Sequence, residues 1–372
     1  MGKFLSKKFL KKEGYHLGES LRGKNVIKIN ANESPYPPSL LAIRSVTDAI
    51  LAGQNLYADP QCTELRKAAA AYYSLEPEQV FVDSGSDVIL AYCMIAYNSC
   101  GEGFCFPDVT YNFYKTFSEF FSLQYQEIPV QKDFSICVDD YCHCCSNVML
   151  ANPNAPTGLK IPLKDIERIL LSNPDHLVVI DEAYVDFGNE TCVPLINQYD
   201  NLMVIHTMSK SHNLAGARIG LAFSSAKNID DLALMKAAFN PDSLNTVSQV
   251  LGCAALQDTA YTKKCVHETE KVRDAFRRAL LARKFAVLKS NTNFLFVKPL
   301  AVPAEYLYRK LKENGILIRY YDQPRIRDYV RISIGTEEQM HIVIQAIDKI
   351  VSDYKIKELG NSVMTVFPSL EK

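Results

Sequence analysis

The sequence lacks an excess of charge of either sign, an apolar run long enough to cross a bilayer, and internal repeats. Its 41 lysines and arginines balance 42 aspartates and glutamates, which leaves a formal net charge of -1. Without an overall field, the chain has no general attraction to nucleic acid or to an anionic membrane. No segment has the composition of a signal sequence or of a membrane span, and no repeat indicates a solenoid. These absences favour small-molecule chemistry.

The eleven cysteines are odd in number, and no leader-like segment accompanies them. This combination favours reduced thiols and a cytoplasmic location. Four consecutive residues, Cys142-His143-Cys144-Cys145, superficially resemble a metal cluster. No second matching pair stands at the spacing of a zinc site, so we interpret the motif as a loop of ordinary thiols and predict no metal.

From about residue 40 the sequence alternates helical periodicity with short apolar runs. Apolar runs separated by helices are typical of a largely parallel sheet that is covered on both faces. The pattern therefore predicts an α/β fold whose large domain contains a mostly parallel mixed sheet. The predicted strands are 80–83, 103–106, 147–151, 176–181, 201–207 and 218–223, and the predicted helices are 40–52, 63–74, 86–97 and 161–171.

At 372 residues the chain exceeds one ordinary core and suits a large domain with a smaller one. Helical periodicity from 243 to 284 could link the two. Short strands at 294–297, 316–319 and 329–334, with helices near 303–314 and 336–354, predict a smaller α+β domain. We assign residues 1–49 to an N-terminal arm and part of the small domain, 50–265 to the large domain, 266–358 to the small C-terminal domain, and 359–372 to a flexible tail.

A lysine, Lys210, follows the predicted strand at 201–207. Ligands of open α/β sheets bind at the carboxyl ends of strands, and a lysine in such a crevice can lose its proton and attack an aldehyde. A lysine after a strand is more often a solvated surface residue, so this motif alone is weak evidence of catalysis.

A second predicted strand ends in Asp181-Glu182-Ala183-Tyr184. Asp181 could hold a pyridinium ring nitrogen, because a protonated ring accepts electrons from a carbanion. The alternatives are that Asp181 caps the following turn and that Tyr184 is a core residue.

Two further strands run into polar turns. One is followed by Asn152-Pro153-Asn154-Ala155-Pro156-Thr157-Gly158, which is either a tight turn or a source of an amide for a phenolate oxygen. The other passes through Ser84-Gly85-Ser86-Asp87 into a predicted helix. The free amides of a helix start suit a phosphate, although a plain helix cap explains this motif nearly as well. Each of the four strand ends offers a different part of one cofactor site. One shared site therefore explains the four motifs better than four separate structural roles.

As a set, these motifs resemble the fold-type I aminotransferases, which depend on pyridoxal 5'-phosphate. The shared residues are Asn154 to Gly158, Asp181 to Tyr184, and Ser209-Lys210 with Arg218 eight positions later. INANESPY at 29–36, Tyr57 in LYADP and VRISIG at 330–335 are similar to the histidinol-phosphate aminotransferase family. The resemblance spans about residues 15 to 355 in the same order.

The resemblance implies a role for each matching residue around the cofactor. Lys210 would carry it as a Schiff base and move the substrate proton, while Asp181 would pair with the ring nitrogen. Tyr184 and Asn154 would contact the ring oxygen O3'; Ala155 stands where the family commonly has asparagine, so the amide role passes to Asn154. The remaining implied contacts are Tyr111 stacked on the ring, the phosphate held by Gly85, Ser86, Asp87, Thr207, Ser209 and Arg218, and Tyr57 reaching the phosphate of a neighbouring subunit.

The same resemblance implies a homodimer with shared active sites and two substrate-binding arginines. Arg331 would bind the glutamate carboxylate, and Arg319 would bind the phosphate of histidinol phosphate, with Tyr15 closing over it. Asn32, in INANESPY, completes the predicted substrate site. The implied reaction is transamination between L-histidinol phosphate or imidazole-acetol phosphate and 2-oxoglutarate or L-glutamate. The alternatives are an aromatic amino-acid aminotransferase, a threonine-phosphate decarboxylase-like enzyme, and a non-enzymatic effector-sensing regulator of the same fold.

Overall fold

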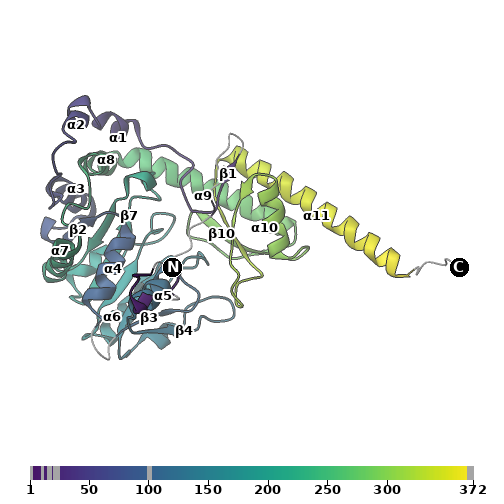
Figure 1. Cartoon of the computed structure of the whole chain (residues 1–372), viewed down its shortest axis with the longest axis horizontal. Helices are drawn as coiled ribbons and strands as arrows, with labels where there is room; N and C mark the ends of the chain where they lie inside the picture. The colour runs from purple at the N-terminus through teal and green to yellow at the C-terminus, as the bar shows by residue number, and fades with distance from the viewer. Residues whose placement is uncertain (1–2, 10–11, 15–18, 20–25, 99–102, 367–372) are drawn as a thin grey trace.

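A computed structural model describes residues 3–9, 12–14, 19, 26–98 and 103–366 of the chain. Figure 1 shows a large α/β domain, a smaller domain beside it, and one long helix that extends away from both. The predicted α/β class, with a mixed and mostly parallel sheet, is confirmed. Among the described residues, no helix is both long enough and apolar enough to cross a membrane.

The large domain is built on a seven-stranded sheet in the order β2-β8-β7-β6-β5-β3-β4. Strand β8 is antiparallel to its neighbours β2 and β7, and the other pairings are parallel, so the sheet is mixed and mostly parallel. The strands are β2 (Val80–Asp83), β3 (Phe104–Pro107), β4 (Tyr125–Ile128), β5 (Asn147–Ala151), β6 (Val178–Asp181), β7 (Leu202–Thr207) and β8 (Gly220–Phe223).

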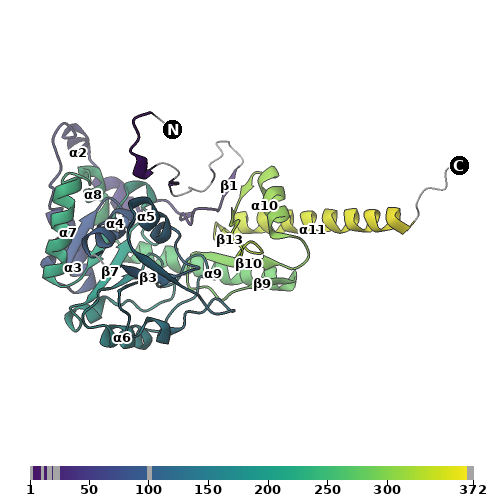
Figure 2. The ribbon, with the colours of Figure 1, turned by 60° about the horizontal axis from the view of Figure 1, so that its bottom comes forward.

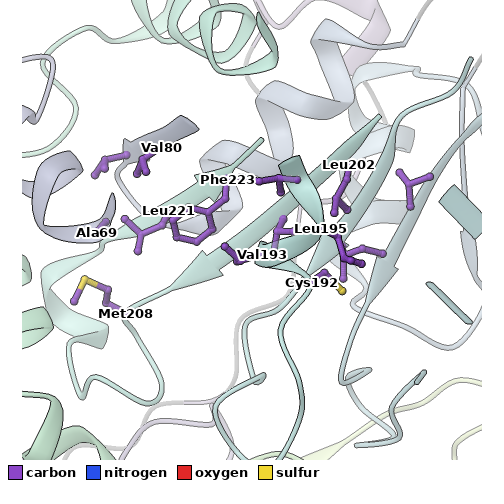
Figure 3. Packing of buried hydrophobic residues seen from close by; sticks show 14 of the residues in the cluster. Ala69, Val80, Cys192, Val193, Leu195, Leu202, Met208, Leu221 and Phe223 are labelled. Atoms are coloured by element: carbon purple, nitrogen blue, oxygen red, sulfur yellow. The ribbon is translucent and has the colours of Figure 1, made fainter. Parts of the chain in front are cut away.

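Helices cover both faces of this sheet, which explains why its central strands read as unbroken apolar runs. On one face, side chains such as Val148, Ile180 and Val204 pack with α3 (Thr63–Tyr73), α6 (Leu163–Ser172) and α8 (Thr246–Gln257). Figure 3 shows part of this layer, with Leu221 and Phe223 of β8 directed toward Val80 and Ala69. The alternate side chains, such as Met149 and Ile205, face α4 (Ser86–Ala96), α5 (Phe113–Phe121) and α7 (Ala226–Phe239). In Figure 2, α5 and α6 lie on opposite sides of β3.

The small domain contains the antiparallel sheet β12-β13-β10-β9 and a parallel pair, β1 with β11. Its apolar core includes Leu295, Leu307 and Ile347. Because β1 pairs with β11, residues close to the N-terminus belong to this domain. Its elements are β1 (Ile27–Lys28), β9 (Phe285–Val287), β10 (Phe294–Pro299), β11 (Ile316–Leu317), β12 (Arg319–Tyr320), β13 (Val330–Ser333), α10 (Ala304–Glu313) and α11 (Glu337–Val366).

Several boundaries differ from the sequence expectations. The helix expected at 40–52 is divided into α1 (Leu40–Ser45) and α2 (Asp48–Ala52), because Thr47 is extended and caps α2 through its side chain. The predicted domain boundary after 265 falls inside α9 (Thr259–Ala282), which runs from the large domain toward the small one (Figure 1). Helix α11 continues to Val366, so the segment expected to be a loose tail from 359 begins as helix.

Candidate active site

The polar motifs found in the sequence converge at one edge of the large sheet. Strands β5, β6 and β7 are parallel neighbours, and their register places Ala151 beside Asp181 and Asp181 beside Ile205. The turns that follow these three strands therefore emerge at the same edge, where open α/β sheets bind ligands. Lys210 follows β7 by three residues, so it lies in the loop adjacent to the Asp181 turn.

The Lys210 amine lies between the two domains. Its Nζ donates to the backbone carbonyl of Ala31 at 3.3 Å and lies 5.9 Å from the centre of the Tyr184 ring. Burial, reinforced by the positive charge of Arg331, lowers the pKa of Lys210 to about 8. A neutral amine is therefore accessible near neutral pH, as attack on an aldehyde requires.

Asp181 is a buried carboxyl, 5% exposed, at the last position of β6. The phenol of Tyr114 donates to its Oδ2 at 2.8 Å, and the amide of Ala183 donates to its Oδ1 at 3.1 Å. Burial raises the pKa of Asp181 to about 6 in spite of these bonds. A carboxylate removed from water in this way favours a cationic partner, because an opposite charge offsets the cost of desolvation. Sequence reasoning did not identify Tyr114, which looked like one aromatic among many.

Asn32 fixes Tyr184 across the domain boundary. Its amide nitrogen Nδ2 donates to the Tyr184 phenol oxygen at 2.7 Å. Asn32 is itself held by Ser333 of β13, which accepts from its backbone amide and donates to its Oδ1, both at 2.9 Å. Asn293 also donates to its backbone carbonyl at 3.0 Å. The predicted site residue Asn32 therefore connects the phenol of the large domain to the small-domain sheet.

An anion cradle lies where β2 passes into α4. Gly85 has φ +90, and a Cβ there would lie 2.7 Å from the Arg218 guanidinium nitrogen Nη2. The helix begins at Ser86, so free backbone amides meet the arginine at this point. Arg218 donates to Asp87 at 3.4 Å. Thr207 and Ser209 are joined through their hydroxyls at 2.9 Å in the turn after β7. The space that only glycine leaves, beside a guanidinium and a helix start, suits a phosphate group.

Tyr111 lies beside the cradle and lines a cavity of about 270 Å³. Its hydroxyl donates to Asp87 Oδ1 at 2.9 Å, and its ring meets Tyr114 edge to face at 5.7 Å. The ring is therefore oriented by contacts from both sides, as an aromatic platform for a flat ligand must be.

Arg319 and Arg331 line the same cavity from the small domain. They are direct cross-strand partners in the β12–β13 pairing. Arg331 donates through Nη2 to the Asn30 carbonyl at 2.9 Å. The ring of Tyr321 lies 5.6 Å from the Arg319 guanidinium and 5.9 Å from that of Arg331. Two neighbouring guanidiniums can each bind an anionic group, so the cavity suits ligands that have a carboxylate or a phosphate.

Asn154 is positioned differently from the expectation that it contacts a ring oxygen. Its Nδ2 donates to the Val109 carbonyl at 2.9 Å and to the Thr157 hydroxyl at 3.1 Å, while its Oδ1 accepts from Thr110 at 2.7 Å. These three bonds occupy the amide within the large domain. The geometry therefore favours a structural role for Asn154 and leaves Tyr184 as the better partner for a ring oxygen.

One predicted residue is not brought into the site within this chain. Tyr57 is 88% exposed in the segment after α2. Tyr15 lies outside the described residues.

Two sets of residues next to the site escaped sequence reasoning. Buried Glu182 accepts from His206 at 2.7 Å and from the Cys192 amide at 2.7 Å, which fixes the turn between Asp181 and Tyr184. At the cavity, Asp108 of the large domain is ion-paired with Arg325 of the small one. His206 could have been noticed from the sequence, since a polar side chain inside the apolar strand β7 needs a hydrogen-bond partner, but the sequence did not identify Glu182 as that partner.

Comparisons with known proteins identify the family of the chain. The model of the family "Aminotransferase class I and II" matches residues 24–347. The chain is 40% identical to a histidinol-phosphate aminotransferase from Brachyspira hyodysenteriae, over 95% of this chain and all of that protein. A histidinol-phosphate aminotransferase from Marinomonas is 42% identical over 93% of this chain and 99% of its own length.

Solved structures share the fold. A putative histidinol-phosphate aminotransferase from Erwinia carotovora atroseptica superposes with a TM-score of 0.80 at 27% identity, covering 90% of this chain and 97% of that one. A histidinol-phosphate aminotransferase from Sinorhizobium meliloti, in complex with pyridoxal-5'-phosphate, gives a TM-score of 0.79 at 22% identity, covering 88% and 91% of the two chains. The chain belongs to the class I and II aminotransferases and, within them, to the histidinol-phosphate aminotransferase family.

Proposed function

We propose that this aminotransferase interconverts L-histidinol phosphate and imidazole-acetol phosphate, with 2-oxoglutarate and L-glutamate as the partner pair, in L-histidine biosynthesis. The observation that carries the proposal is the pair of neighbouring arginines, Arg319 and Arg331, that line one cavity. One substrate of this reaction has a phosphate, and the other has a carboxylate at the far end of its side chain. Two adjacent arginines match this requirement for anion recognition.

The enzyme uses pyridoxal 5'-phosphate, whose electron-withdrawing ring stabilises the carbanion formed when a substrate loses its Cα proton. The residues of this chain fit that cofactor. The glycine cradle beside Arg218 has the room and the charge for the phosphate, Asp181 is a desolvated acid, and Lys210 is an amine with a depressed pKa.

In this proposal the phosphate would rest on the backbone of Gly85, Ser86 and Asp87 at the start of α4, with Thr207, Ser209 and Arg218. Tyr111 covers the ring face. Asp181 would pair with the ring nitrogen and favour its protonated form, because a buried carboxylate gains most from a neighbouring positive charge. Tyr184, oriented by Asn32, donates to the ring oxygen. Lys210 would hold the cofactor through its amine and would be the base that moves the Cα proton, because its depressed pKa leaves a neutral amine accessible near neutral pH.

For the substrates, we assign the carboxylate of glutamate to Arg331 and the phosphate of histidinol phosphate to Arg319. The backbone bond from Arg331 to Asn30 supports a fixed orientation for the first guanidinium. Tyr15 remains a proposed cover for the phosphate.

We also propose a homodimer with shared sites. Tyr57 is 88% exposed in one chain, and the helices before it expose apolar side chains. Such a surface matches burial against a second copy, which would place Tyr57 at the partner's phosphate cradle. The exposed apolar residues are Leu40, Leu41, Ile43, Leu51 and Leu56. Ten described cysteines are free thiols, which supports a reducing cytoplasmic location.

Replacing Arg319 by alanine tests the substrate assignment. Loss of a charge-assisted contact of about 1.5–3 kcal/mol predicts a KM for histidinol phosphate raised by roughly 10-fold to 100-fold. The KM for glutamate should change far less. Arg309→Ala is a matched control, since Arg309 lies exposed on α10 and pairs with Glu305. Equal effects on both substrates would remove Arg319 from the phosphate site, and release of carbon dioxide from threonine phosphate would favour the decarboxylase alternative.

A further inference from the structure

The cysteine-rich loop at 142–145 approaches a thiol of the central sheet. Cys105 lies on β3 between Phe104 and Phe106, and its side chain faces the layer that contains Tyr141 and α6. Cys144 lies in the turn that precedes β5. The two sulfur atoms are 3.8 Å apart, with the Cys105 thiol donating to Cys144 Sγ. They belong to segments separated by 39 positions, so the fold itself brings them together.

The two thiols differ in access. Cys105 is 1% exposed, whereas Cys144 is partly exposed. A cavity of about 330 Å³ opens over the loop and is lined by Gln124, Asp140 and residues 142–146. A small solute can therefore reach Cys144 from solvent, and Cys105 lies directly behind it.

The two thiols also differ in acidity, and the more accessible one, Cys144, is the more acidic. The hydrogen bond from Cys105 lowers the pKa of Cys144, while the same contact and burial raise the pKa of Cys105. The thiolate is the form that reacts with oxidants, so Cys144 is the attacking group and Cys105 the resolving one. The Cys144 backbone is held by Asn173, whose Oδ1 accepts from its amide at 2.7 Å.

We propose that Cys105 and Cys144 form a reversible disulfide when the protein meets a hydroperoxide. The Cys144 thiolate attacks one peroxide oxygen, the O–O bond breaks, and a sulfenic acid forms with release of hydroxide, which is protonated to water. The Cys105 sulfur then attacks the Cys144 sulfur and displaces the sulfenic oxygen, which leaves as water after taking the Cys105 proton. Two thiols lose two electrons in total, and hydrogen peroxide becomes two waters.

The neighbouring thiols are less well placed to compete. Cys144 Sγ also lies 3.7 Å from the Asp140 carbonyl, but it is the thiol that lies against Cys105. Cys142 directs its thiol to the Val138 carbonyl at 3.4 Å, and Cys145 is exposed. The bridge would attach the loop to β3, the strand that leads to Asp108 and Tyr111 at the cavity. The proposal rests on the geometry, access and acidity of these two thiols and does not depend on the substrate assigned above.

The test treats the full-length enzyme with a small excess of hydrogen peroxide at neutral pH, then alkylates it after denaturation and maps the peptides by mass spectrometry. Alkylatable thiols should fall from eleven to nine, with one linked pair of peptides containing Cys105 and Cys144, and dithiothreitol should restore all of them. Cys144→Ser should lose no thiols, whereas the matched control Cys145→Ser should still lose two.

A second measurement uses the unmodified chain. Thermal unfolding should shift to higher temperature after oxidation and return with dithiothreitol, because a bridge restricts the unfolded chain. A bridge from Cys144 to Cys142 or Cys145, or sulfinic acid at Cys144 beside an intact Cys105, would overturn the proposal. So would equal thiol loss in Cys144→Ser and in the parent protein.

Discussion

Replacing Asp181 by asparagine should stabilise the cofactor-free protein at neutral pH. Burial raises the pKa of this carboxyl from 3.8 to about 6, a change of about two units. At roughly 1.4 kcal/mol per unit, the buried carboxylate costs about 3 kcal/mol of folding free energy once it is ionised. The function of Asp181 would therefore be maintained at a cost in stability.

The sign of the pH dependence follows from the raised pKa. Between about pH 4 and pH 6 the folded state binds the Asp181 proton and the unfolded state does not, so this contribution to stability falls as the pH rises through that window. Asp181→Asn removes the titrating group. Relative to the parent protein, the free energy of unfolding of the variant should be about 2.4 kcal/mol larger at pH 7.5 than at pH 4, because a small part of the effect is already present at pH 4. Any constant cost of burying the amide cancels in that difference.

Urea unfolding of both cofactor-free proteins at several pH values measures the effect. Asp348→Asn is a control of opposite sign, because the bonds from Arg283 lower the pKa of Asp348 and its loss should weaken the protein at neutral pH. Pyridoxal 5'-phosphate should reduce the difference between parent and Asp181→Asn by supplying a positive charge. A gap between the two proteins that is the same at pH 4 and pH 7.5 would refute the reasoning.

Two further predictions concern the phosphate cradle. Gly85→Ala should weaken cofactor binding at least 10-fold (about 1.4 kcal/mol) in a fluorescence titration, because the new Cβ meets Arg218 at 2.7 Å and alanine is strained at φ +90; unchanged affinity would contradict the cradle. Mixing inactive Lys210→Ala with inactive Tyr57→Ala subunits should restore about a quarter of parental activity, because half of randomly formed dimers would contain one intact site of two. Failure to restore activity in mixed dimers would contradict the shared site.

Much of the fold could be predicted from the sequence because the strands of the large sheet are covered by helices on both faces and therefore form continuous apolar runs. Strand β7 is buried at every position, so its apolar run could be read without a partner. Strand β4 was not predicted, since YQEI at 125–128 lies at the sheet edge with only Ile128 fully buried. Helix α7 was missed because its apolar positions are weakly segregated, with Leu234 exposed and Lys236 buried.

In the candidate site, too, features set by local sequence could be predicted and contacts between distant segments could not. Lys210 and Asp181 could be placed because Asp181 ends one strand and Lys210 closely follows another, and both strand ends are defined locally. Contacts between distant segments could not be predicted: Asn32 reaches Tyr184 across 152 positions, and Tyr114 reaches Asp181 across 67. For Asn154, the family pattern suggested a ring contact, but its amide is held by the neighbouring loop.

The attachment site of pyridoxal 5'-phosphate tests the central claim most directly. Borohydride reduction of the complete enzyme, followed by peptide mass mapping, should find the cofactor fixed to Lys210, and Lys210→Ala should lose both the label and turnover. Label on another lysine, or full activity in Lys210→Ala, would contradict the account.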